Sequence, residues 1–141
     1  MSNVSIASEK SGLVANSSAV ILAGRVLLSI IFILAGYAKL TAIAGTAGWF
    51  GSLGLPLPTV TTVVVGVVEV VAGLAILVGY QTRIAAIVLA LFTLAASAVA
   101  HTDLADQVQM MFLQKNLAIA GGLFVLAAAG AGALAVDARR S

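Results

Sequence analysis

Four long apolar stretches constrain this chain more than any other feature of its sequence. They cover residues 19–40, 60–78, 84–100 and 117–136. A helix that crosses a membrane needs about 20 apolar residues, and each stretch approaches or meets that length. The chain is 62% hydrophobic and only 9% charged, so it lacks the side chains for a soluble surface. We therefore predict an all-α integral membrane protein, a four-helix bundle surrounded by the lipid bilayer.

The stretches divide the chain into a short tail and one membrane domain. Residues 1–18 are rich in Ser, Asn and Ala, and we expect them to form a disordered tail. Residues 19–141 form the four-span domain. The first stretch is full-length and charged at both ends, unlike the short apolar core of a cleaved signal, so we interpret it as an uncleaved span.

The first connection, residues 41–58, contains Gly, Pro, Trp49 and Phe50. It is too interrupted for a span and too apolar for a free loop, so we expect it to lie along the membrane surface. Trp49 and Phe50 then serve as interfacial anchors. Residues 101–114 form the most polar internal stretch and are the natural docking surface.

The second connection is short enough only for a tight hairpin, with Gly79 as a helix terminator and Thr82 as a cap. Four spans place the termini and this hairpin on one side of the membrane. Basic residues are more frequent on that side, where they are Lys10, Arg25, Arg83, Arg139 and Arg140, than on the other, where they are Lys39 and Lys115. The positive-inside rule therefore predicts that both termini are cytoplasmic.

Glu69 lies in the middle of the second apolar stretch. An ionised carboxylate there costs roughly 2.5 to 3.5 kcal/mol, so it is expected to be paired, protonated or facing a cavity. Gly66 and Gly73 share its helix face and let a neighbouring helix approach. Glu69 is therefore predicted to point at protein, either as a structural hydrogen bond that fixes packing or as part of a buried polar site.

Two other helices carry polar stripes. On the first span, the stripe is expected to face the bundle, although its two basic residues could instead reach the two headgroup layers; it comprises Arg25, Phe32, Gly36 and Lys39. On the third span, Thr93 and Ser97 belong to the only polar face and are expected to contact Glu69. His101 follows that span, either as an interfacial residue satisfied by water or as a proton-exchanging group close to Lys39 and Lys115.

The composition excludes several kinds of chemistry. The chain has no cysteine and one histidine, which leaves out thiol chemistry, iron–sulfur clusters, histidine-based zinc sites and a bis-histidine haem. Only a haem held by His101 with Met110 or Met111 stays formally open. We expect no haem, iron–sulfur cluster or metal. The charge is not gathered into a patch that would bind nucleic acid.

Scattered positions along residues 25–136 resemble the DoxX family of small bacterial four-helix membrane proteins. The positions are Arg25, Phe32-x-x-x-Gly36-x-x-Lys39, Leu53-Gly54-Leu55-Pro56, Gly66-x-x-Glu69-x-x-x-Gly73, Gly79, Arg83, His101, Lys115-Asn116-Leu117 and Gly121. The resemblance implies a multi-pass protein of the bacterial inner membrane, related to the membrane subunit of thiosulfate:quinone oxidoreductases. It also implies a role as an oxidoreductase subunit or as a membrane partner of redox enzymes.

Our leading hypothesis is a membrane subunit that interacts with quinone, because a quinone enters between helices and needs only hydrogen-bond and proton donors from protein. In this hypothesis Glu69 is a buried proton acceptor, His101 and Lys115 donate to a quinone carbonyl, and Arg25 and Lys39 set the local charge. The alternative is a non-catalytic scaffold that recruits soluble redox enzymes. A small transporter and a homo-oligomer also stay open, although the sequence shows no broken span or inverted repeat.

Overall fold

The computed structural model describes residues 2–140, and this part of the chain is helical, without strands. The elements in chain order are α1 (Ser2–Thr41), α2 (Ile43–Ser52), α3 (Pro58–Val78), α4 (Thr82–Ala100), α5 (Gln107–Ala129) and a short 3₁₀ helix, η1 (Asp137–Arg139). Among the described residues, the helices α1, α3, α4 and α5 are long and apolar enough to cross a membrane. The predicted all-α fold with four spans is confirmed.

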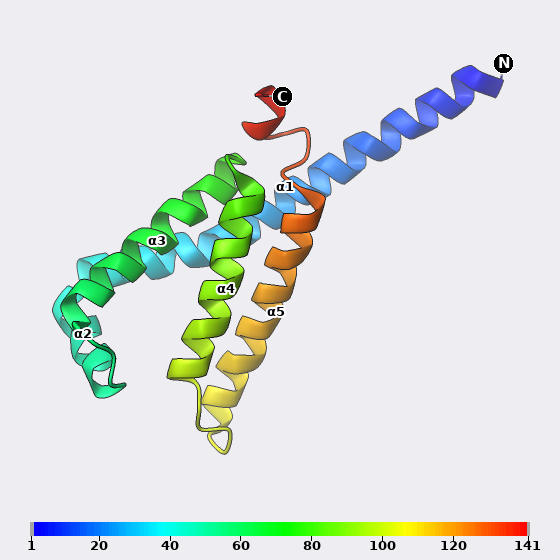
Figure 1. The fold of residues 1–141 in the computed structure, drawn as a ribbon. Helices are drawn as coiled ribbons and strands as arrows, with labels where there is room; N and C mark the ends of the chain where they lie inside the picture. The colour runs from blue at the N-terminus through cyan, green and yellow to red at the C-terminus, as the bar shows by residue number, and fades with distance from the viewer. Residues whose placement is uncertain (1, 141) are drawn as a thin grey trace.

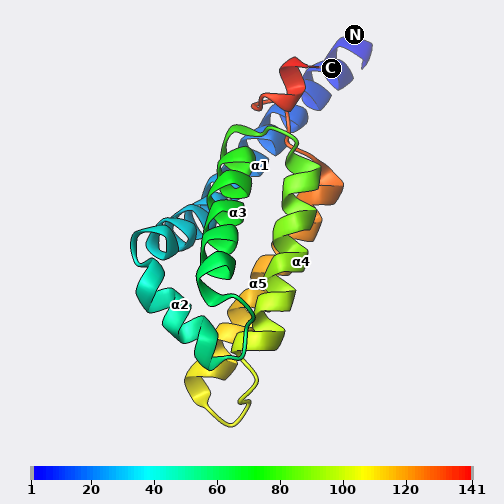
Figure 2. The ribbon, with the colours of Figure 1, turned by 60° about the vertical axis from the view of Figure 1, so that its left-hand side comes forward.

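The spans pack as two pairs, with α1 along α3 and α4 along α5 (Figure 1). A tight turn joins α3 to α4, and the two helices diverge as they leave it (Figure 1). The short helix α2 packs beside α3, at the end of the molecule remote from that turn. The C-terminal segment lies at the same end as the turn (Figures 1 and 2).

Glycines bring α1 and α3 close together. A Cβ atom on Gly36 would lie 2.6 Å from the carbonyl oxygen of Gly66, and one on Gly73 would lie 3.0 Å from Ile33. Small residues are the usual means by which membrane helices approach at backbone distance. The stripe of the first span that was expected to face the bundle therefore packs on the glycine face of the second span.

Large apolar side chains cover the outside of the bundle. Leu27 on α1 and Val125 on α5 are 72% and 69% exposed. On a soluble protein this outer surface would promote aggregation, whereas hydrocarbon is the favourable solvent for it. The interior is a small cluster made mainly by α4 and α5, with Phe32 and Ile76 contributed by α1 and α3.

The last span begins and ends earlier than the predicted residues 117–136. Asp106 caps α5, because its carboxylate accepts the backbone N–H groups of Val108 and Gln109 at 2.8 and 3.0 Å. The helix therefore starts at Gln107, and most of the polar segment expected as an external docking loop forms roughly its first two turns. After Gly130 the chain leaves the span.

The C-terminal segment folds back over the turn between α3 and α4. The backbone N–H groups of Val136 and Asp137 donate to the carbonyl oxygens of Val78 and Gly79 at 3.1 and 2.8 Å. Gly79 ends α3 with φ 76°, a left-handed conformation that glycine adopts without strain, as the sequence predicts.

Asp137 supplies the cap that the sequence assigned to Thr82. Its two carboxylate oxygens accept the N–H groups of Gln81 and Thr82 at 2.7 and 2.9 Å, at the start of α4. Partial burial acts to raise the pKa of Asp137, but these hydrogen bonds and the charge of Arg140 outweigh it and hold the pKa below its ordinary value. A residue distant in sequence therefore stabilises the hairpin.

The N-terminal segment and the first connection are both more helical than the sequence predicted. The segment expected as a disordered tail is helical, because α1 continues back to Ser2 as a single helix whose first turns extend beyond the bundle (Figure 1). The connection expected as a surface loop contains α2, which buries Ala47 and Phe50 while leaving Trp49 47% exposed. Periodic apolar contacts against α3 fold this segment despite its glycines.

Candidate functional site

A buried ion pair joins the last turn of α1 to the middle of α3. The ammonium nitrogen of Lys39 lies 2.9 Å from Oε2 of Glu69 and donates to Oε1 at 3.2 Å. The same nitrogen also donates to the carbonyl oxygen of Ala35 at 3.4 Å. The two side chains are 20% and 6% exposed. Each charge compensates the other, so Lys39 points into the bundle and does not reach toward a headgroup layer.

Among residues 2–140, Thr93 and Ser97 on the polar face of α4 form no hydrogen bond with Glu69, contrary to the expectation. Thr93 donates to the carbonyl oxygen of Leu89 at 2.7 Å, and Ser97 donates to that of Thr93 at 2.8 Å. The hydroxyl of Ser97 also accepts a hydrogen bond from the Asn116 side chain on α5 at 2.9 Å. Because α4 packs along α5, its polar stripe turns toward that helix and away from α3.

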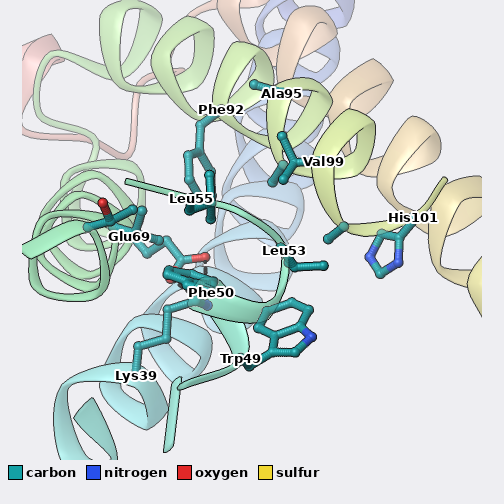
Figure 3. A pocket seen from close by; sticks show the side chains of 14 residues that line it. Lys39, Trp49, Phe50, Leu53, Leu55, Glu69, Phe92, Ala95, Val99 and His101 are labelled. Carbon is teal, nitrogen blue, oxygen red and sulfur yellow. Dashed lines mark hydrogen bonds and ion pairs between the residues drawn. The ribbon is translucent and has the colours of Figure 1, made fainter. Parts of the chain in front are cut away.

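A cavity of about 330 Å³ lies beside the ion pair, where α3 and α4 diverge and α2 covers their ends (Figure 3). Its walls are almost entirely apolar. The lining residues are Lys39, Trp49, Phe50, Leu53, Leu55, Thr61, Val65, Glu69, Phe92, Ala95, Ala96, Val99, Ala100 and His101. Pockets for small molecules typically combine such walls with a few polar groups that fix orientation.

His101 supplies a second polar group on the cavity wall, from the residue directly after α4. Its backbone N–H closes the helix by donating to Ser97, and its ring stacks on Phe112 with centroids 5.4 Å apart. Its buried Nδ1 has no hydrogen-bond partner among residues 2–140. An unpaired buried nitrogen is costly, and this atom is itself covered, so the imidazole ring must turn before Nδ1 can bond to anything in the cavity.

The cavity is open along one edge, between α2 and α4. Trp49, Ala95 and Val99 line it and are nevertheless exposed at the molecular surface. Figure 3 shows Trp49 and Leu53 on one side of the space, with Val99 and His101 on the other. A ligand in this cavity therefore stays in contact with the surroundings of the protein.

Arg25 lies far from this cavity, beside the turn between α3 and α4. It is 1% exposed and donates four hydrogen bonds of 2.7 to 2.9 Å to backbone carbonyl oxygens. Those carbonyl groups belong to Ile76, Leu77, Ala131 and Leu134. Arg25 therefore closes the end of α3 and anchors the C-terminal segment, a structural role that sequence spacing alone does not reveal.

Lys115 is exposed on α5, with its ammonium nitrogen 5.5 Å from the centre of the Phe112 ring. Of the five residues predicted for the site, the structure brings Lys39, Glu69 and His101 to the cavity and leaves Arg25 and Lys115 outside it. Sequence reasoning missed the wall formed by Leu53, Leu55 and Phe92. The interrupted apolar connection was the available signal for the first two.

These features define a small four-span membrane protein with a buried ion pair beside an apolar cavity. Residues 20–102 match the DoxX family model, and the chain belongs to this family. It is 39% identical to the inner membrane protein YqjF of Escherichia coli (strain K12), over 83% of this chain and 88% of that protein.

Two further relatives differ in coverage. The chain is 33% identical to the inner membrane protein YphA of the same organism, over 84% of this chain and 89% of that protein. It is also 35% identical to CatD of Bacillus subtilis (strain 168), whose name assigns it provisionally to the oxidoreductases, over 51% of this chain and 52% of that protein. No solved structure matches the chain.

Proposed function

We propose that the cavity holds the ring of a membrane quinone and that the protein is the quinone-interacting subunit of an oxidoreductase system. One arrangement carries this proposal. An apolar cavity has the Lys39–Glu69 ion pair on one wall and His101, whose buried Nδ1 has no hydrogen-bond partner among residues 2–140, on another. Apolar walls suit a ring drawn from lipid, and the polar groups suit its oxygens.

The size of the cavity fits a ring and not a whole quinone with its chain. Its volume of about 330 Å³ is at the lower end of ligand pockets, which hold roughly 300 to 1,000 Å³. The open edge leaves a path for a chain. A bound quinone would supply reversible transfer of two electrons and two protons, chemistry for which the side chains of this protein have no substitute.

The lining residues have distinct roles in the proposal. Lys39 would donate a hydrogen bond to a ring oxygen, and Glu69 would accept a proton from the site. His101 would form a hydrogen bond with the opposite ring oxygen. It would also exchange protons with the solvent at the end of the bundle where the loop after α4 lies. Arg25 has its donors engaged by carbonyl groups and Lys115 lies outside the cavity, so neither enters the proposal.

The names of the relatives support a membrane location and a connection to redox chemistry. YqjF and YphA are named as inner membrane proteins, and we extend that location to this chain. The name of CatD adds an oxidoreductase connection over about half the chain. Because the chain has no cysteine, we expect its electrons to come from a separate redox enzyme.

The test is to purify the protein in mild detergent and measure bound quinone per protein by mass spectrometry. We expect quinone in the wild type, at least tenfold less in Glu69→Gln and His101→Phe, and no change in the control Lys115→Gln. Each variant must elute as a monodisperse protein. A wild type without quinone that co-purifies stoichiometrically with a soluble enzyme would contradict the proposal and support the scaffold alternative.

A further inference from the structure

We infer that the ligand enters the cavity sideways from the bilayer, between α2 and α4, and that the paired charges admit only molecules without net charge. The inference rests on the proposed function for the identity of the ring. It adds the route of entry, the residues that form the entrance and the electrostatic selection of the ligand.

The entrance consists of apolar side chains. Trp49 on α2 and Val99 on α4 are 47% and 40% exposed, and both line the cavity together with the exposed Ala95. An opening toward water would normally be bordered by polar groups. Hydrocarbon is the solvent that such an edge matches, so a lipid-soluble molecule reaches the cavity without crossing water.

The cavity also extends to the level of Glu69, near the middle of α3. That position lies within the apolar span and not at its end, so the hydrocarbon region surrounds this part of the helix. The open edge continues from Val99, next to the end of α4, to Ala95, about one turn deeper in the span, so a chain attached to the ring can pass between α2 and α4 and remain in lipid. The geometry favours an amphiphile with a compact polar ring and an apolar chain.

The charges on the wall select against ions. Lys39 and Glu69 are the charged residues among the 14 that line the cavity, and they neutralise each other. A neutral ligand leaves this balance intact. An anion or a cation would place an uncompensated charge in an apolar enclosure, which is strongly unfavourable. Small inorganic anions are therefore excluded as ligands of this cavity.

The experiment uses Trp49, the only tryptophan in the sequence, as the reporter in proteoliposomes. The probe is a benzoquinone with a decyl chain, and its binding is followed by quenching of the tryptophan lifetime. Ala95→Phe and Val99→Phe narrow the entrance without touching the polar groups. Val88→Phe is the matched control, because Val88 is exposed on α4 and is not among the lining residues.

We expect the rate of quenching after mixing to fall at least tenfold in the two entrance variants and to stay unchanged in Val88→Phe. A quenching rate that is insensitive to both entrance variants, with quinone still bound, would overturn lateral entry and leave the proposed function standing. If the entrance variants fail to fold, the test uses the wild type alone. Quenching of Trp49 by brominated lipids is then compared with its quenching by acrylamide in the aqueous phase. Stronger quenching by acrylamide would overturn the inference.

A separate arm tests the selection by charge with laurate and lauryl alcohol as probes. The wild type should bind the alcohol at least tenfold more tightly than the anion, and Glu69→Gln should reverse that preference by leaving Lys39 uncompensated. Equal binding of both probes by the wild type would overturn the selection. If brominated lipid quenches Trp49 and the alcohol binds but quinone does not, the proposed function fails and lateral entry stands.

Discussion

Lys39 and Glu69 meet at 2.9 Å and tie the end of α1 to the middle of α3. The same two helices are joined again toward the other end of α3, where Arg25 donates to the carbonyl oxygens of Ile76 and Leu77. Between these polar contacts the backbones approach closely at glycines. The helix pair that forms one wall of the cavity is therefore held at two levels, the middle and the C-terminal end of α3, which keeps the ion pair beside the cavity.

Breaking the ion pair from one side should be worse than removing it altogether. Lys39→Met and Glu69→Leu each leave a buried charge without its partner, and we expect each to lower the free energy of unfolding by about 3 to 5 kcal/mol. The double variant should lose less than either single variant. Equilibrium unfolding in mixed micelles measures all four proteins. Additive losses would show that the two charges do not depend on each other.

Gly36→Ala should weaken the contact between α1 and α3. The new methyl group would lie 2.6 Å from the carbonyl oxygen of Gly66 and 2.7 Å from a methyl carbon of Val70, so the helices must separate. We expect a loss of about 1 to 3 kcal/mol. Gly24→Ala is the control on the same helix, because its methyl group would meet nothing within 4 Å. Equal stability of the two variants would contradict this packing.

Asp137→Ala should destabilise the turn between α3 and α4 in a pH-dependent manner. The pKa of Asp137 is held below its ordinary value of 3.8, so its contribution is fully present above that value. It is lost as the pH falls through the lower pKa of the folded state. At pH 7 we expect a difference of about 1 kcal/mol between wild type and variant, typical of a helix cap.

That difference should shrink as the pH is lowered below 3.8. Hydrogen exchange at the amides of Gln81 and Thr82 follows the effect locally. Glu9→Ala, in the exposed first part of α1, is the control that should change neither quantity at any pH. A difference between wild type and Asp137→Ala that stays constant down to acid pH would contradict the role of the ionised carboxylate.

The distribution of basic residues predicts that both termini face the cytoplasm. An alkaline phosphatase fusion after Arg140 should therefore be inactive, and one placed in residues 101–106 should be active. Matched green fluorescent protein fusions should give the opposite pattern. An active phosphatase at the C-terminus with an inactive one in residues 101–106 would reverse the orientation.

The protein-facing sides of α1 and α3 were predictable because helical periodicity places side chains on faces without knowledge of the rest of the fold. Gly36, Gly66 and Gly73 on two apolar helices indicated close packing, and Glu69 among them indicated a protein-facing acid. The partner of Glu69 was not predictable in the same way. Both Lys39 and the α4 stripe with Thr93 were available, and only the rotation of α4 toward α5 separates them.

The capping of α4 shows the same limit. Thr82 was the local candidate, but the cap comes from Asp137, which lies far along the chain and reaches the turn because the C-terminal segment folds back. Arg25 was assigned to the site by its charge and helix face, although its guanidinium closes the end of α3. Sequence spacing gives the face of a residue and not the depth or identity of its partner.

The sequence by itself determined that this protein is surrounded by lipid and that its secondary structure is helical. Long apolar stretches with few charges leave only helices that cross a membrane, because backbone groups must bond within the helix when water is absent. The tertiary structure alone decided which of Arg25, Lys39, Glu69, His101 and Lys115 share a cavity. That outcome depends on how the two helix pairs diverge and how α2 covers the gap, and it follows from side-chain packing between segments that no local pattern encodes.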